Sequence, residues 1–411
     1  MQQPALKRSL SLTMLVLYGL GTTIGAGIYV LIGKVAGQAG AFSPLSFLLA
    51  AIVAGPTAMS FGELAARYPQ SAGEAVYVEE GFGLPNLSTG VGLAVVFVGL
   101  VSSAAIISGA VGYLQNFVAL PFWLGLLCVA AVLGLLAVWG ITESVAVTAV
   151  ATLLEIGGLV VIVWSGREAF DAAHISSALS TAPSLSAIGL AGTLSGAVLA
   201  FYAFIGFEDM VNVSEEVREP SRNMPRAIVL TLVITGVLYV AVSWVSVVAL
   251  PADVLSASKA PMSDIFQHLT GLPSHGFDAL VVGAVTNGAL VQIIMASRVL
   301  YGLARQGWLP AFFGTVAART RTPVFATASA SAAVFLLAAA FPLGALARAT
   351  SFITLLIFAL VNVALLRIRS RPAERTESGG LPIVVPVLGF GFSVALAAFQ
   401  VADILFGAAP A

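Results

Sequence analysis

The feature that most constrains this chain is a series of long apolar segments, each near the length that crosses a lipid bilayer. A bilayer-spanning helix needs about 20 mostly apolar residues. Eleven stretches of the sequence meet that description: residues 10–33, 41–66, 87–117, 121–140, 143–165, 187–214, 226–250, 277–303, 323–340, 344–366 and 382–407. The connections between them are too short to hold a separate soluble domain. The pattern therefore predicts an all-α integral membrane protein with about eleven transmembrane helices.

Charge is too scarce for a water-exposed surface of this size. Only 9% of the 411 residues are charged, whereas 59% are hydrophobic, and soluble domains carry about 25% charged residues. We therefore expect the lipid bilayer to be the outer solvent for much of the molecule. No basic run is interleaved with aromatic residues, which argues against nucleic-acid binding. The apolar stretch after Lys7 and Arg8 is too long for a cleaved signal peptide.

The distribution of lysine and arginine predicts the orientation, because cytoplasmic loops are enriched in these residues. With the N-terminus inside and the segments alternating, 14 of the 18 Lys and Arg residues lie inside and 4 outside. One missing or extra segment in the middle would destroy this bias. The count therefore predicts a cytoplasmic N-terminus, and the eleventh segment alone places the C-terminus outside.

Two segments carry interruptions at matching places. Gly25 and Gly27 lie in the first span, whereas Gly206, Glu208 and Asp209 lie in the sixth. The pairs Ile24-Gly25 and Ile205-Gly206 are 181 positions apart, near the starts of two blocks of five segments. Because five is odd, the second block enters the membrane from the opposite side. Such an arrangement is typical of inverted repeats, whose interrupted helices form the binding site of a secondary transporter.

The interruptions predict complementary groups for a zwitterion. Amides freed at the start of a half-helix attract an anion, so we expect Ile24, Gly25, Ala26 and Gly27 to hold a carboxylate. Carbonyls freed in the sixth segment suit an ammonium group, and we assign that role to Ala203, Phe204 and Ile205. The solute's side chain would then meet Phe201, Phe204 and Phe207. The alternative is close helix packing, which also uses small residues at four-position spacing, but the matched pair of interruptions favours a site.

At these residues the sequence resembles the amino acid–polyamine–organocation (APC) superfamily, nearest to its cationic-amino-acid-transporter-like bacterial permeases. Three stretches carry the likeness: residues 21–29, residues 201–228 and residues 296–307. The resemblance covers nearly the whole chain. It implies one transporter domain, 1–411, with the LeuT-type fold. Residues 10–165 and 187–366 would be the inverted repeats, 382–407 an additional helix, and an amino acid would bind at the breaks in helices 1 and 6.

Glu155 is a departure from this resemblance, since proton-coupled relatives often carry a lysine at the matching position of the fifth helix. A carboxylate inside an apolar span is expensive when ionised and marks a functional site. We expect Glu155 to gain and lose a proton, or to pair with the substrate amine or a cation, during transport. The alternative is a neutral glutamic acid that is hydrogen-bonded between helices.

Glu208 and Ser297 are further polar candidates in the spans. Glu208 is expected to line the substrate pathway, with a structural role at a helix end as the alternative. Its neighbour Asp209 would point about 100° away on a regular helix, so we expect only one of the two to face the cavity. Ser297 offers a hydroxyl for a sodium ion near the first break, but proton coupling is favoured, and no other metal or cofactor site is expected.

Charged residues also gather at the cytoplasmic end of the sixth segment, where they form either a solvated face or an inner gate of ion pairs. The gate would include Arg67 and Glu63 together with Glu215, Glu216, Arg218, Glu219, Arg222 and Arg226.

The predicted function is secondary active amino acid transport, by proton symport or exchange. A polyamine or other organic-cation permease and a sodium-coupled symporter remain alternatives. An ion channel is disfavoured because filter loops and charged rings are missing from the sequence. Convergent catalytic residues and nucleotide motifs are missing too, so we expect no enzyme. The expected location is a bacterial plasma membrane. The sequence leaves the substrate's side chain and the oligomeric state open.

Overall fold

The computed structural model describes residues 10–70, 73–139, 145–171, 187–305, 309–317, 320, 322–371 and 380–406. Within these ranges the chain is helical, and the sole β-type pairing is an isolated bridge between Leu10 and Val217. The all-α prediction is therefore confirmed for the described part of the chain.

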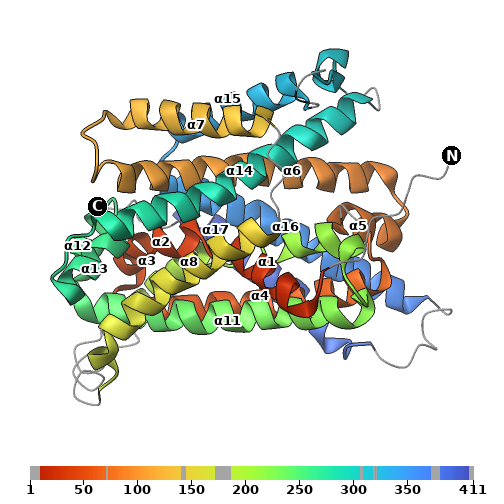
Figure 1. Cartoon of the computed structure of the whole chain (residues 1–411). Coiled ribbons are helices and arrows are strands. Elements are labelled where there is room, and N and C mark those ends of the chain that lie inside the picture. Colours follow the sequence, from red (N-terminus) through yellow and green to blue (C-terminus); the bar gives the residue numbers. More distant parts are fainter. Residues whose placement is uncertain are drawn as a thin grey trace.

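The first half of the chain forms seven α-helices before the long α8, and the second half begins at α10 (Figure 1). The helices of the first half are α1 (Leu12–Thr23), α2 (Ala26–Tyr29), α3 (Ile32–Ala39), α4 (Ser43–Arg67), α5 (Gly73–Phe82), α6 (Pro85–Leu114), α7 (Phe122–Trp139) and α8 (Val145–Ser165). Those of the second half are α10 (Ala187–Tyr202), α11 (Pro220–Ala249), α12 (Ala252–Ala257), α13 (Pro261–Thr270), α14 (His275–Arg305), α15 (Val324–Ala340), α16 (Leu343–Ser370) and α17 (Val384–Phe406). Short 3₁₀ helices include η2 (Arg167–Phe170) and η3 (Glu208–Glu216).

Eight helical stretches in the described ranges are long and apolar enough to cross a membrane. Three shorter apolar helices, Val150–Ser165, Gly189–Tyr202 and Val324–Ala340, occupy the places of the fifth, sixth and ninth predicted segments. The sixth predicted segment, 187–214, is helical as α10 only as far as Tyr202. The seventh, α11, begins six residues earlier than predicted, at Pro220, and so carries Arg222 on the helix rather than in a loop. Proline suits this first turn because the first amides of a helix need no partner within it.

The helices pack in pairs around the interrupted first helix. In Figure 1, α7 and α15 lie along one edge of the bundle and α4 and α11 along the opposite edge, with α1 between them. Large apolar side chains point outward: Trp139, Trp164 and Leu135 are 77%, 70% and 68% exposed. Apolar exposure on this scale suits lipid rather than water. The protein is an integral membrane protein whose polar groups of interest lie inside the bundle.

Candidate functional site

The first helix is interrupted where its glycines predict. α1 ends at Thr23, Ile24 is extended, and Gly25 has φ 178° and ψ −137° before α2 begins at Ala26. The first amides of a helix have no acceptor within it. The N–H groups of Gly25, Ala26 and Gly27 therefore stand free of the α1 ladder, which ends with the bond from Ile24 N–H to the Leu20 carbonyl.

The sixth span is interrupted at the matching place. α10 ends at Tyr202, and η3 starts at Glu208 after a run of turns. Gly206 adopts a φ of +125°, a backbone conformation that favours glycine. The carbonyls of Ala203, Phe204 and Ile205 accept none of the hydrogen bonds found among the described residues. Both interruptions leave backbone polar groups inside the membrane protein, which is tolerated where they line a cavity or are buried in protein.

The two interruptions touch each other. The hydroxyl of Thr22 donates a 2.9 Å hydrogen bond to the Gly206 carbonyl. A Cβ atom on Gly206 would lie 2.2 Å from the Thr22 carbonyl oxygen, and a Cβ on Gly27 would lie 2.3 Å from the Cα of Ala203. Hydrogen is thus the only side chain that fits at either position without a shift of backbone.

A cavity of about 50 Å³ lies at this contact. Its lining includes the predicted residues Ile24, Gly25, Ala26, Gly27 and Ile205. Sequence reasoning missed Ser102 of α6, Tyr202 and, as a lining residue, Gln292 of α14. Ser102 Oγ lies 3.0 Å from the Tyr202 hydroxyl. The sequence signal for these three residues was a polar side chain in an otherwise apolar span. Such a residue does not tell which face of its helix turns toward the cavity.

The predicted aromatic residues lie behind the break and do not line this cavity. Phe201, Phe204 and Phe207 are fully buried. The Phe204 ring packs edge-on against Tyr239 at 5.2 Å between centroids. The Phe201 and Phe207 rings contact Phe358 of α16 at 5.9 and 5.4 Å. Ala203 meets Gly27 through its backbone. These four residues therefore pack behind the break and do not line the cavity.

Glu208 and Asp209 both line a second cavity of about 30 Å³, which shares Ser102, Ile205 and Gln292 with the first. The prediction that only one of the two carboxylates faces a cavity is wrong. The side chain of Glu208 turns back to accept the Gly206 N–H at 2.8 Å. Asp209 reaches α14, where Gln292 Nε2 donates to it at 3.3 Å. The regular-helix angle does not apply because the chain here is not an α-helix.

Glu155 lies in α8, is 2% exposed, and contacts the end of α2, the short helix that follows the first break. The Tyr29 hydroxyl donates to the backbone carbonyl of Glu155, and the Tyr113 hydroxyl donates to the Tyr29 carbonyl. The carboxylate oxygen Oε2 of Glu155 is buried and has no hydrogen-bond partner among the described residues. Glu155 does not line either of the two small cavities.

Ser297, the residue considered for a sodium ion as the alternative to proton coupling, is 3% exposed and donates its hydroxyl proton to the Ile294 carbonyl at 2.8 Å. Within the described ranges, no group of three or more His, Cys, Asp or Glu side chains is placed to hold a metal ion.

Two of the predicted inner-gate residues, Glu63 and Arg67, belong to one largely buried network of ion pairs, together with Arg369. The Glu63 carboxylate accepts from Arg67 of α4 at 3.0 Å and from Arg369 of α16 at 2.8 Å. The pair of Arg222 and Glu219 is exposed, and its charged atoms lie 4.0 Å apart.

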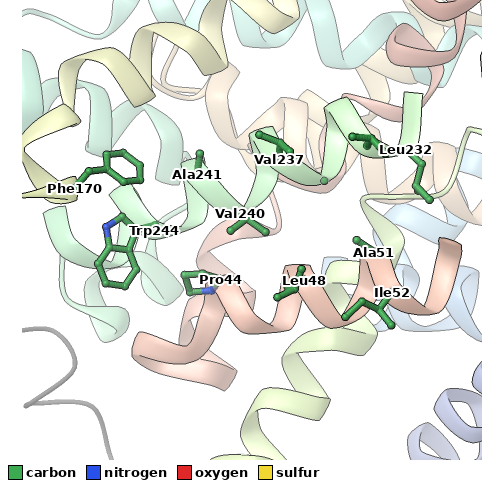
Figure 2. A pocket seen from close by; sticks show the side chains of 12 residues that line it. Pro44, Leu48, Ala51, Ile52, Phe170, Leu232, Val237, Val240, Ala241 and Trp244 are labelled. Carbon is green, nitrogen blue, oxygen red and sulfur yellow. The ribbon is translucent and has the colours of Figure 1, made fainter. Parts of the chain in front are cut away.

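A much larger cavity, about 720 Å³, lies between α4 and α11 (Figure 2). Its lining is apolar and includes Leu48, Ile52, Val237 and Trp244. The Trp244 indole N–H already donates to the Ala169 carbonyl at 2.9 Å. Small-molecule sites need a few convergent polar groups, and a zwitterion would find none here. The small polar cavities at the breaks are therefore the candidate site.

The chain is similar to known transport proteins over most of its length. The amino acid permease family model matches residues 9–407. The vacuolar cationic amino acid transporter 4 of Arabidopsis thaliana is 32% identical over 90% of this chain, which spans 64% of that protein. An uncharacterized transporter of Mycobacterium tuberculosis is 31% identical over 98% of this chain and 89% of its own length. The branched-chain amino acid permease BcaP of Bacillus subtilis is 27% identical over 93% of this chain and 86% of its own. The chain thus spans less than two thirds of the length of the Arabidopsis transporter.

Proposed function

The chain belongs to the amino acid permease family, within the APC superfamily, and on that premise we propose that it is a secondary active transporter that moves amino acids across a membrane by alternating access. One bundle of helices would rock or gate against the rest around a central site. The fold we propose is the LeuT type, with residues 10–165 and 187–366 as the inverted repeats and 382–407 as an additional helix.

The observation that carries this proposal is the contact of the two helix interruptions around one polar cavity. We assign the substrate carboxylate to the free amides of Gly25, Ala26 and Gly27. Ile24 lines the cavity beside them, but its own N–H donates to the Leu20 carbonyl. The carbonyls of Ala203, Phe204 and Ile205 would take the ammonium group. A cavity of about 50 Å³ is far below the roughly 300–1,000 Å³ of open ligand sites. The described conformation is therefore a closed one, and binding requires it to open.

The class of substrate side chain follows from what lies beside the closed cavity. Phe201, Phe204 and Phe207 would favour an apolar side chain if opening exposes them. Glu208, on the adjoining cavity, would favour a cationic one. The names of the relatives include both classes, cationic for the Arabidopsis transporter and branched-chain for BcaP. Polyamines and other organic cations are the runner-up substrates.

We propose proton symport or substrate exchange as the driving mode, with Glu155 as the coupling residue. Its buried carboxylate oxygen Oε2 has no partner among the described residues, and its backbone carbonyl accepts from Tyr29, the last residue of the short helix after the first break. Both observations support that role. Sodium coupling near Ser297 is less well supported, because that hydroxyl proton is engaged within its own helix. A bacterial plasma membrane with the N-terminus in the cytoplasm is the proposed setting.

Counterflow in proteoliposomes tests the proposal. Vesicles that contain purified protein are loaded with one unlabelled amino acid and given a trace of the same labelled compound outside. A transient, saturable accumulation of label is expected for an alternating-access carrier. A panel of apolar and cationic amino acids and polyamines, run in the same way, would identify the class. Linear, unsaturated flux would indicate a channel, and chemical conversion of the solute would indicate an enzyme; either result would refute the proposal.

A further inference from the structure

The lining of the cavity of about 30 Å³ beside the candidate site includes three acidic residues from two separate elements. Glu74 comes from α5, and Glu208 and Asp209 come from η3. Glu74 and Glu208 are 4% and 8% exposed. α5 is not one of the helices long enough to span the membrane. We call this cavity the acidic chamber. Among the described residues, its lining contains no lysine, arginine or histidine.

Two further polar atoms at the acidic chamber have no partner. Thr354 of α16 is 2% exposed, and its hydroxyl makes no hydrogen bond among the described residues. The Oε1 atom of Gln292 is buried and unpartnered as well, although its Nε2 donates to Asp209. Unpaired buried polar atoms are costly. A volume of about 30 Å³ exceeds the ~10–15 Å³ that one water needs, so the chamber is sized and lined for a water molecule among acids.

Like charges so close together resist simultaneous ionisation, because each charge disfavours the next. Burial raises the pKa of Glu74 from an ordinary 4.5 to about 7, and the nearby carboxylate of Asp209 adds to the rise. The other groups that face the chamber are neutral: Val95, Val98, Ser102, Ile205, Gln292, Met295, Thr354, Ile357 and Phe358. Tyr77, one turn further along α5, has a buried, unpartnered hydroxyl and carries no charge to offset the acids.

We propose that Glu74, Glu208 and Asp209 form a proton-binding site around the acidic chamber, separate from Glu155, and that this site binds and releases one proton during transport. The three carboxyl groups would share the proton with the enclosed water, to which Thr354 and Gln292 offer hydrogen bonds. Release would leave an additional negative charge in a closed chamber whose described lining has no cationic residue, so the closed arrangement of α5, η3 and α16 is favoured while the proton is bound.

The acidic chamber is also placed to sense the substrate. Ser102, Ile205 and Gln292 line both small cavities, and Gln292 holds Asp209 through its amide nitrogen. A solute that enters at the breaks would contact these residues and alter the surroundings of the acids. This link to transport rests on the proposed function, whereas the proton site itself does not.

The test is the pH dependence of thermal unfolding of the purified full-length protein in detergent, in sodium-free buffer between about pH 4.5 and about pH 8.5. A group whose pKa is raised in the folded state contributes stability that is full below its unfolded pKa and lost as the pH rises through its folded pKa. The wild-type Tm should therefore fall as the pH rises from about 4.5 to about 7. Glu74→Gln should lose that part of the slope.

Glu80→Gln is the matched control, because it removes a carboxylate from the same helix but away from the acidic chamber. It should keep the wild-type slope. Thr354→Val keeps the volume and removes the unpartnered hydroxyl, so less polar surroundings should move the midpoint upward by about 0.5 pH unit or more. This variant also keeps the proposal testable if Glu74→Gln does not fold.

Equal slopes in wild type, Glu74→Gln and Glu80→Gln would overturn the proposal, as would an unmoved midpoint in Thr354→Val. The same Tm measurement at about pH 8 with and without sodium distinguishes a proton site from a sodium site. A rise in Tm with sodium that Glu74→Gln abolishes would make the chamber a sodium site and refute the proton assignment. Absence of counterflow in the wild type would refute the transport function and leave the Tm profiles to decide the proton site.

Discussion

The hydroxyl of Thr22 donates a 2.9 Å hydrogen bond to the carbonyl oxygen of Gly206, and so joins the first helix interruption to the second. The same hydroxyl lies 3.0 Å from the Gly19 carbonyl, one turn back in α1. One side chain therefore serves both the end of its own helix and the backbone turn of the other. Neither interruption can rearrange without changing the partners of Thr22.

Thr22→Val should weaken this junction. The substitution preserves the shape and removes the donor, which leaves the Gly206 carbonyl without the side-chain partner; the expected loss is about 1 kcal/mol of stability. A lower Tm and weaker substrate binding should appear together, measured by thermal shift with and without the amino acid that shows counterflow. Thr22→Ser restores the hydroxyl and should recover both. Equal behaviour of Val and Ser variants would show that the bond contributes nothing.

Gly206→Ala should be severely destabilising. The φ of +125° is strained for any L side chain, at a cost of about 1–3 kcal/mol, and the new Cβ would approach the Thr22 carbonyl to 2.2 Å. We expect a large drop in Tm and loss of counterflow. Gly283→Ala in α14 is the control, since an added Cβ there meets nothing within 4 Å. A Gly206→Ala protein as stable as the Gly283→Ala protein would mean that the turn can relax.

Glu155→Gln should uncouple transport from the proton gradient. Glutamine keeps the size of the side chain but cannot gain or lose a proton. Uphill uptake driven by an acidic exterior should fall about 10-fold or more, because the residue that transfers the proton is lost. The measurement is uptake of labelled substrate into proteoliposomes. Glu168→Gln, an exposed carboxylate in η2, serves as the control. Unchanged rate and pH dependence in Glu155→Gln would assign Glu155 a structural role.

Glu63→Ala should destabilise the protein through two arginines at once. The Glu63 side chain is 9% exposed and binds Arg67 and Arg369, whose side chains are 16% and 13% exposed. Removal of one partner from a buried ion pair costs about 3–5 kcal/mol. Glu219→Ala removes the carboxylate of an exposed pair with Arg222, for which about 0.5 kcal/mol or less is expected. Chemical denaturation of the two variants should therefore separate clearly, and similar midpoints would contradict the buried network.

The places of the interruptions could be predicted because glycine and acidic residues stand out in an apolar span. The direction of the side chains around them could not. Phe201, Phe204 and Phe207 follow one another at three-residue spacing, and such spacing marks a common face without telling what that face meets. In the structure two of the rings contact Phe358, more than 150 positions away. That residue belongs to a helix whose sequence carries no sign of the pairing.

The acidic residues show the same limit. Asp209 reaches the acidic chamber because η3 is a 3₁₀ helix that follows an irregular turn, and a prediction that assumed a regular α-helix placed it wrongly. Glu74 stands in a short connecting helix, where a carboxylate in isolation looks like a solvated side chain. Only the packing of α5 against α16 and α6 buries it.

Close backbone contact at Gly27 and Gly206 has a consequence for genetics. Suppose that a library of single substitutions is selected for growth on the transported nutrient. Alanine at these two positions should disappear from the surviving pool, because their added Cβ atoms would overlap backbone. Sterically, Gly25 differs, since an added Cβ there meets nothing within 4 Å. Sequencing counts along the two interrupted helices would then trace their line of contact from survival alone.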